Sequence, residues 1–204
     1  MKVKICGLRD LAAARAAVEA GADYVGFVFA PTRRYVRPEV VSSIVHVLPG
    51  SVGKVGLFVN EHPETIRSIV SQCGLDYVQL CGKETPDYCR SLGVPVVKSL
   101  PVRGAAFANE LDQYLDVAEW CVLDGFRPNA HGGTGQTFDW ALAEAVVDRG
   151  RIMVAGGLTP ENVGEAIRIA RPWGVDVSSG VETDGQKDVT KIAAFVAAAR
   201  RGGA

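Results

Sequence analysis

The sequence predicts an α/β fold, a single-domain (β/α)8 TIM barrel that occupies residues 1–204. Short apolar runs alternate with helix-forming segments along the whole chain, and this alternation predicts a parallel sheet. The alternation repeats eight times, about once in every 25 residues, and eight units predict closure into a barrel. No linker-like segment divides the chain. An open doubly wound sheet is the alternative, but it usually has fewer units, and no GxGxxG sequence follows the first strand.

The predicted strands are apolar runs that break into glycine, small or polar residues, as expected of buried parallel strands. In chain order they cover residues 3–5, 24–29, 54–59, 77–80, 95–100, 120–123, 152–155 and 175–177. The active site of a barrel lies where its strands end and its loops begin. The candidate site is therefore formed by the strand ends, at Cys6, 29–34, 79–81, Asp124, 156–157 and 178–180.

Each predicted helix follows a strand and begins at a capping residue or a proline, or is recognised by apolar residues at helical spacing. The helices are expected from Asp10 to Gly21, from Pro38 to Pro49, from Pro63, from Thr85, over 109–117, over 138–147, from Thr159, and over 189–200.

Composition excludes several classes of function. The net charge is −1 without a long basic run, so nothing favours binding to nucleic acid or to a membrane surface. The apolar stretches are too short to span a bilayer, and the first ten residues do not resemble a signal peptide. The five cysteines form an odd set without CxxC or metal-ligand spacing. We expect reduced thiols, a cytoplasmic protein, and no metal or cofactor.

Two consecutive strands near the C-terminus predict a phosphate site. The first ends in Gly156-Gly157, and the second ends in Ser178-Ser179-Gly180. Such turns expose backbone N–H groups and hydroxyls that together suit a phosphate dianion. Either turn alone is equally consistent with an ordinary strand-to-loop connection. Their occurrence on consecutive strands resembles the phosphate site of a (β/α)8 barrel, and we therefore favour phosphate binding.

A thiol and a carboxyl stand at the same predicted barrel mouth, where Cys6 closes the first strand and Asp124 the sixth. They can serve as a base and an acid. Taken alone, each has an ordinary structural explanation, a buried cysteine and an Asp-Gly turn respectively. Arg33 and Arg34 follow the second strand, and either guanidinium can hold a carboxylate with two hydrogen bonds. The glycine-rich segment 131–135 is a candidate lid over the ligand.

Two charged residues are expected to point into the barrel. Lys4 and Asp176 lie on the first and last strands, which adjoin in a closed barrel, and each precedes a site residue by two positions. Alternation along a strand turns such pairs the same way. Because inward charges need partners, we predict a Lys4–Asp176 ion pair beneath the site. By the same reasoning, the side chain of Lys98 on the fifth strand can also point into the barrel.

Taken together, the motifs resemble those of the phosphoribosylanthranilate isomerase family, and the resemblance spans nearly the whole chain. They are 3–8 (VKICGL), 78–80 (VQL), 123–124 (LD), 132–135 (GGTG) with 138–140 (FDW), 155–158 (AGGL) and 175–182 (VDVSSGVE). The resemblance implies a (β/α)8 barrel enzyme of tryptophan biosynthesis. It implies an Amadori rearrangement of N-(5-phosphoribosyl)anthranilate to 1-(2-carboxyphenylamino)-1-deoxyribulose 5-phosphate.

The resemblance also implies residue roles. Cys6 takes the position of the general base and Asp124 that of the general acid, while Arg34 is implied to bind the anthranilate carboxylate. The backbone of Gly156, Gly157, Ser178, Ser179 and Gly180 is implied to bind the phosphate. Because a free thiol is mostly protonated at neutral pH and the acid must keep its proton, we expect both pKa values to move toward neutrality.

Three departures from the family pattern stand at the mouth: Thr32-Arg33-Arg34 in place of Ser-Pro-Arg, Cys81 in place of histidine, and Gly125 in place of serine or threonine. They leave the acid and the base unchanged. Other phosphosugar barrels are alternatives. An indole-glycerol-phosphate synthase would need a catalytic lysine paired with carboxylates at the strand ends, where this chain has a cysteine and an aspartate. A pentose-phosphate epimerase would need metal ligands, and the histidines of this chain are not placed to supply them. A non-catalytic phospholigand-binding barrel is a further alternative. The expected partner is a small phosphosugar-anthranilate substrate, and the sequence is equally compatible with a monomer and with a homodimer.

Overall fold

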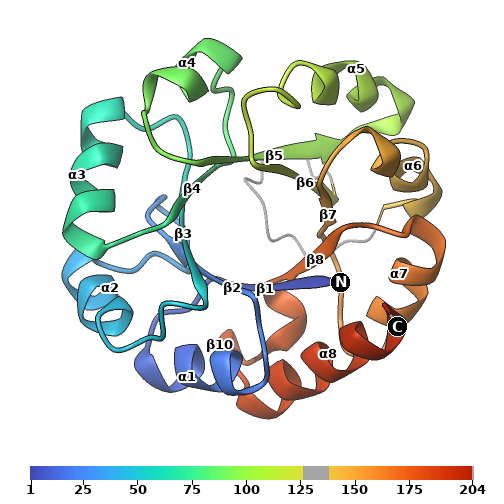
Figure 1. Cartoon of the computed structure of the whole chain (residues 1–204). Coiled ribbons are helices and arrows are strands. Elements are labelled where there is room, and N and C mark those ends of the chain that lie inside the picture. Colours follow the sequence, from blue (N-terminus) through green and yellow to red (C-terminus); the bar gives the residue numbers. More distant parts are fainter. Residues whose placement is uncertain (126–137, 204) are drawn as a thin grey trace.

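Eight parallel strands close into a barrel, as the sequence predicts, and Figure 1 looks along its axis. The computed structural model describes residues 1–125 and 138–203. Each strand pairs with its neighbours in sequence, and the eighth pairs with the first. The strands are β1 (Lys2–Cys6), β2 (Tyr24–Val28), β3 (Gly53–Phe58), β4 (Tyr77–Leu80), β5 (Val96–Val102), β6 (Trp120–Gly125), β7 (Ile152–Val154) and β8 (Gly174–Val177).

The helices form a ring outside the barrel (Figure 1). They are α1 (Leu11–Glu19), α2 (Pro38–Val45), α3 (Pro63–Cys73), α4 (Pro86–Ser91), α5 (Phe107–Asp112), α6 (Trp140–Glu144), α7 (Val163–Ala170) and α8 (Val189–Gly202). Asp10, Thr85 and Asp188 cap α1, α4 and α8 by accepting hydrogen bonds from first-turn N–H groups. The main apolar core lies between this ring and the outer face of the barrel. The strands are therefore covered on both faces, which accounts for their nearly continuous apolar sequence.

Three helices begin elsewhere than the sequence predicts. The seventh helix starts at Val163 rather than at Thr159-Pro160, because the Asn162 side chain binds the backbone N–H of Thr159 and the carbonyl of Gly157, forming a separate turn first. The fifth helix is earlier and shorter than 109–117, since a 3₁₀ turn (η1, Gly104–Ala106) leads directly into it. The sixth, expected over 138–147, is also shorter, and a second 3₁₀ turn (η2, Val147–Arg149) follows it.

A small hairpin after β8 was not predicted. A 3₁₀ turn (η3, Ser179–Val181) leads into β9 (Glu182–Thr183), which pairs antiparallel with β10 (Gln186–Lys187). The connecting residues Asp184 and Gly185 both have positive φ, 50° and 75°. That backbone is typical of an Asp-Gly hairpin turn, so the dipeptide was the available sequence signal.

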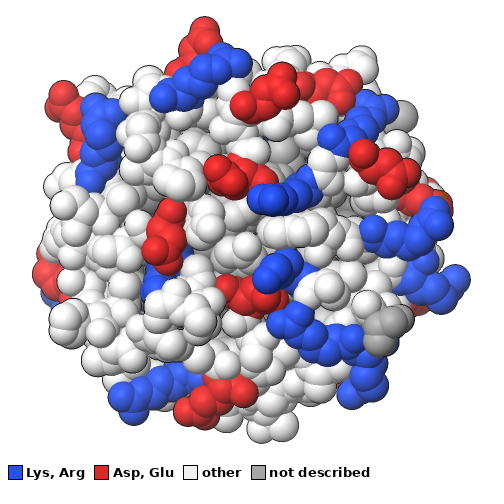
Figure 2. Space-filling view, viewed as in Figure 1, with Lys and Arg blue, Asp and Glu red and all other residues white. Residues whose placement is uncertain are grey.

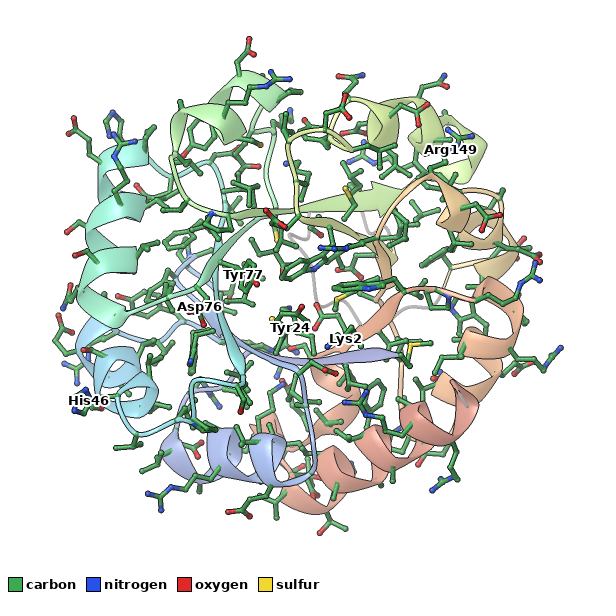
Figure 3. All side chains as sticks on the ribbon, in the orientation of Figure 1. Lys2, Tyr24, His46, Asp76, Tyr77 and Arg149 are labelled. Carbon is green, nitrogen blue, oxygen red and sulfur yellow. The ribbon has the colours of Figure 1, made fainter. Side chains whose placement is uncertain are left out.

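Aromatic rings close the barrel at the amino ends of its strands. Tyr24, Tyr77 and Trp120 begin β2, β4 and β6, and Trp173 immediately precedes β8. The Trp120 ring centroid lies 4.8 Å from those of Tyr24 and Tyr77 and 5.7 Å from that of Trp173. Figure 3 shows Tyr24 and Tyr77 inside the ring of strands, with Lys2 near them. This layer of rings leaves the carboxyl ends as the place for a pocket.

Positive and negative side chains are interspersed over the face seen in Figure 2. Among the described residues, no helix is long and apolar enough to cross a bilayer.

Candidate active site

A pocket opens at the carboxyl ends of the strands, and most of the sequence-predicted site residues line it. They are Cys6, Arg34, Asp124, Gly156, Gly157, Ser178 and Ser179. Gly180 lies directly beside the pocket, against the backbone of Leu158, which is itself part of the wall. Residues from β1, β2, β6, β7 and β8 are thus brought to one cavity, as the barrel prediction requires.

Cys6 and Asp124 face the same cavity from β1 and β6. Cys6 is almost fully buried, and Gly26 of β2 lies so near that a Cβ at that position would stand 2.9 Å from its Sγ. Burial raises the pKa of the Cys6 thiol above its ordinary value, and the opposing charges of Lys4 and Lys187 do not cancel that effect. The expectation that the pKa of Cys6 falls toward neutrality was therefore wrong for the ligand-free site, because desolvation of the thiolate dominates.

The predicted ion pair beneath the site is confirmed. Lys4 Nζ lies 2.8 Å from Asp176 Oδ2, and both side chains are buried. The two residues face each other across paired strands, β1 and β8. Burial alone would lower the pKa of Lys4, but Asp176 and Cys6 outweigh it and raise the pKa. Burial raises the pKa of Asp176, and Lys4 partly opposes that shift.

Lys98 does not point into the barrel, so the expectation of an inward side chain was wrong. Its neighbour Ser99 lines the pocket, and alternation along β5 turns Lys98 outward. There its Nζ donates to Glu84 Oε2 at 2.7 Å and to the carbonyl of Gly82 at 2.8 Å. The ammonium also lies over the Tyr114 ring. This buried ion pair supports the loops around the mouth and stays outside the cavity.

The two predicted phosphate turns are in direct contact. Gly156 and Gly157 have φ of 83° and 64°, a left-handed backbone that glycine adopts without strain. A Cβ on Gly180 would stand 1.8 Å from the carbonyl oxygen of Leu158, so only glycine fits there. Among the residues that the structure describes, the N–H groups of Gly157, Ser179 and Gly180 donate to no other backbone group. Donors of this kind from two adjacent loops suit a phosphate.

Arg34 is held in place by a residue to which the sequence analysis assigned no role. Its Nε lies 2.7 Å from Glu182 Oε1 and its Nη2 3.1 Å from Oε2. A guanidinium carries five N–H donors, so its geometry is compatible with holding Glu182 and a ligand carboxylate together. The backbone N–H of Arg34 donates to Thr32 Oγ1, at the position where the family has serine.

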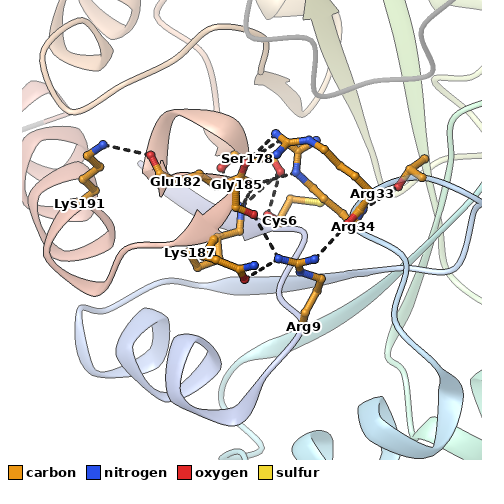
Figure 4. Close-up of polar contacts among 11 residues, drawn as sticks. Cys6, Arg9, Arg33, Arg34, Ser178, Glu182, Gly185, Lys187 and Lys191 are labelled. Atoms are coloured by element: carbon orange, nitrogen blue, oxygen red, sulfur yellow. Dashed lines mark hydrogen bonds and ion pairs between the residues drawn. The ribbon is translucent and has the colours of Figure 1, made fainter.

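Glu182 lies on the new hairpin and is the centre of a cluster of cations (Figure 4). Arg33 Nη2 and Lys187 Nζ lie 2.7 and 2.9 Å from its carboxylate oxygens, in addition to Arg34. Lys187 also donates to the carbonyl of Ser178 at 2.7 Å, and so ties β10 to the predicted phosphate turn. Hydrogen bonds from Arg34 and Lys187 outweigh burial and lower the pKa of Glu182 to about 2.

The other departures from the family pattern also lie at the mouth. Cys81 lines the pocket, and Gln79 Nε2 donates to its Sγ at 3.5 Å. Burial raises the pKa of Cys81 to about 12, so it faces the cavity as a neutral thiol. Gly125 ends β6 directly after Asp124.

The candidate lid, 131–135, lies outside the described residues. Among the residues that are described, no group of three or more histidine, cysteine or acidic side chains is arranged to hold a metal ion. His46 follows α2 on the outside of the barrel, as Figure 3 shows, and His62 precedes α3.

Comparison with known proteins agrees with this geometry. The family described as N-(5'-phosphoribosyl)anthranilate (PRA) isomerase matches residues 3–198. A relative of that name from Desulforudis audaxviator is 49% identical over 199 residues, covering 97% of each chain. The crystal structure of phosphoribosyl anthranilate isomerase from Thermotoga maritima has a TM-score of 0.91 and 41% identity, covering 98% of this chain and 99% of that one. A structure of the isomerase in complex with reduced 1-(o-carboxyphenylamino)-1-deoxyribulose 5-phosphate has a TM-score of 0.88 and 40% identity, with the same coverage.

Proposed function

Because the chain belongs to the N-(5'-phosphoribosyl)anthranilate isomerase family, we propose that it performs the family's reaction with Cys6 as general base and Asp124 as general acid. The reaction is an aldose–ketose isomerisation of tryptophan biosynthesis. It converts N-(5-phosphoribosyl)anthranilate into 1-(2-carboxyphenylamino)-1-deoxyribulose 5-phosphate. The observation that carries the assignment is that one pocket receives a thiol from β1 and a carboxyl from β6, beside two glycine turns in contact.

The chemistry divides into two proton transfers. Asp124 gives a proton to the furanose ring oxygen, the bond from C1 to that oxygen breaks, and the nitrogen lone pair forms the C1=N bond of a protonated Schiff base. The Cys6 thiolate then takes the C2 proton, which becomes acidic beside the cationic C=N group. The electrons of the C2–H bond form the C1=C2 bond of an enolamine, and the C1=N π pair returns to nitrogen. The enolamine becomes the ketone when the C2 hydroxyl loses its proton and C1 gains one. The whole sequence is an isomerisation, so it requires no redox cofactor.

The remaining residues bind the two ends of the substrate in this proposal. The backbone N–H groups of Gly156, Gly157 and Ser178–Gly180 hold the phosphate, in line with the close contact of the two turns. Arg34 binds the anthranilate carboxylate from the rim, where its pair with Glu182 fixes the orientation of the guanidinium. Arg33 is more than half exposed, and we assign it to the Glu182 cluster rather than to the ligand.

Loss of the substrate's anthranilate fluorescence measures turnover and tests the assignment. Cys6→Ser and Asp124→Asn are each expected to lower kcat by about 10²–10⁴-fold, the usual contribution of a positioned acid or base. Cys73→Ser on α3 and the exposed Asp148→Asn are matched controls, and both should turn over like the wild type. Turnover at the wild-type rate by either site variant contradicts the proposed roles.

A further inference from the structure

The Lys4–Asp176 pair lies inside the barrel on the same side of β1 as the proposed base, and Asp176 lines the same pocket as Cys6. Lys4 precedes Cys6 by two residues on β1, so both side chains point into the barrel. The Cys6 Sγ packs against Gly26 of β2, and the absence of a Cβ at that glycine leaves room for the sulfur. Asp176 also lines the pocket, whereas its partner Lys4 is fully covered.

Filling the barrel interior with the Lys4–Asp176 ion pair costs desolvation free energy. Desolvating two charges offsets most of their attraction, and apolar residues of similar volume commonly stabilise such a site equally well or better. The adjacent layer is indeed apolar, with Val55, Val97 and Met153 buried in the interior. Asp176 uses only Oδ2 for Lys4, and within the described part of the chain its buried Oδ1 accepts no hydrogen bond. Packing alone therefore does not account for this pair.

We propose that the Lys4–Asp176 pair positions charge for Cys6: the Lys4 ammonium is the counter-ion of the Cys6 thiolate, and Asp176 holds that ammonium beneath the sulfur. The inference rests on the proposed role of Cys6 as the base. Lys4 and Asp176 act through Cys6, so they are positioning residues. When Cys6 takes the C2 proton, the thiolate charge disappears and Lys4 remains paired with Asp176, so no isolated buried cation forms.

Other charged or titratable groups also face this part of the pocket. They are Arg34 after β2, Cys81 after β4, Asp124 on β6, and Lys187 on β10 with its partner Glu182 on β9. The positive charges of Lys4 and Lys187 lower the pKa of Cys6, whereas burial and Asp176 raise it. Lys4 lowers the pKa of Cys6 by more than Asp176 raises it. The pair as a whole therefore lowers that pKa, and this direction can be tested.

The test measures the reactivity of Cys6 in the ligand-free protein, which does not depend on turnover. Iodoacetamide modifies the thiolate, so the alkylation rate at a fixed neutral pH reports the thiolate fraction. Peptide mass spectrometry separates Cys6 from Cys81, which lines the same pocket and serves as the internal reference for access. Because Lys4→Met alone leaves a buried unpaired carboxylate and can prevent folding, it is combined with Asp176→Asn.

The proposal predicts an order of rates. Asp176→Asn keeps an oxygen for Lys4 and removes the negative charge, so Cys6 should react faster than in the wild type. The double variant K4M/D176N lacks both charges, so Cys6 should react about tenfold or more slowly than in D176N and more slowly than in the wild type. A double variant that reacts like D176N, or like the wild type, overturns the proposal. A structural role for the pair predicts changes at Cys6 and Cys81 together, and that result also overturns it.

The pH profile of kcat/KM separates this inference from the proposed function. If Cys6 is the base, the acidic limb of the profile should move with the alkylation rates, to lower pH in D176N and to higher pH in the double variant. Alkylation rates in the expected order with an unmoved profile support the electrostatic pairing and contradict the role of Cys6 as base.

Discussion

Replacement of Glu182 by glutamine tests whether the hairpin cluster stabilises the mouth. Glu182 is buried against Arg34, Arg33 and Lys187, and Glu182→Gln removes the charge while keeping the shape. Burial alone would raise the pKa of Glu182, but the hydrogen bonds from Arg34 and Lys187 outweigh it and lower the pKa from 4.5 to about 2. At about 1.4 kcal/mol for each pKa unit, ionised Glu182 stabilises the folded state by about 3 kcal/mol.

The sign of the pH dependence follows from the lowered pKa. A carboxyl with a lower pKa in the folded than in the unfolded state stabilises the fold fully above the unfolded value. For Glu182 that stabilisation is present above pH 4.5 and is lost as the pH falls toward about 2. The wild type should therefore be about 3 kcal/mol more stable than Glu182→Gln at neutral pH, and the gap should close over this acidic window.

Urea unfolding of both proteins at a series of pH values measures this difference. Glu165→Gln is the control, because Glu165 pairs with Arg168 at 3.8 Å on the exposed side of α7. An exposed pair of this kind contributes at most about 1 kcal/mol. The reasoning is refuted if Glu182→Gln unfolds within about 1 kcal/mol of the wild type at neutral pH, or if the gap does not change as the pH is lowered.

Three further substitutions test close contacts of the site. Gly180→Ala places a Cβ against the carbonyl of Leu158, so the two phosphate turns must separate, and KM should rise more than kcat falls in the fluorescence assay. Gly26→Ala crowds the sulfur of Cys6, and here kcat should fall more than KM rises; an unchanged kcat contradicts the placement of the thiol. Lys98→Met leaves the buried Glu84 carboxylate with its backbone hydrogen bonds from Asn60 and Gly82 but without its cation, and should lower the free energy of unfolding by about 3–5 kcal/mol in urea titration.

The barrel could be predicted because its strands are continuous apolar runs at a regular spacing, and each run is buried on both faces. The boundaries that differ depend on contacts between side chain and backbone that pattern alone does not show. Asn162 postpones α7 by binding back to Gly157, although Thr159-Pro160 is a good start signal by itself. The Asp184-Gly185 hairpin was predictable from its dipeptide, but its strands are only two residues long and carry no alternating apolar pattern.

The site was predictable to the extent that strand ends determine it. Cys6, Asp124 and the glycine turns were brought together by the closed topology alone. The role of Glu182 was not, because two of its three cation partners, Arg33 and Arg34, come from a distant segment, and the third, Lys187, lies on the unpredicted hairpin. The raised pKa of Cys6 was missed for a similar reason: its sign depends on the balance between desolvation and two lysines, which residue types alone do not fix.

Lys4 and Lys98 show most clearly where sequence reasoning ends. Both are lysines in apolar strands, both are fully buried, and each pairs with a carboxylate at 2.8 or 2.7 Å. Lys4 could be assigned to the interior because it shares its side of β1 with Cys6, a residue already expected in the pocket. Lys98 had no such reference, and a change of one position in the alternation moves a side chain to the opposite face of the sheet. The register of β5 places Lys98 behind the barrel wall with Glu84, whereas Lys4 stands on the inner side of β1, the side that it shares with Cys6.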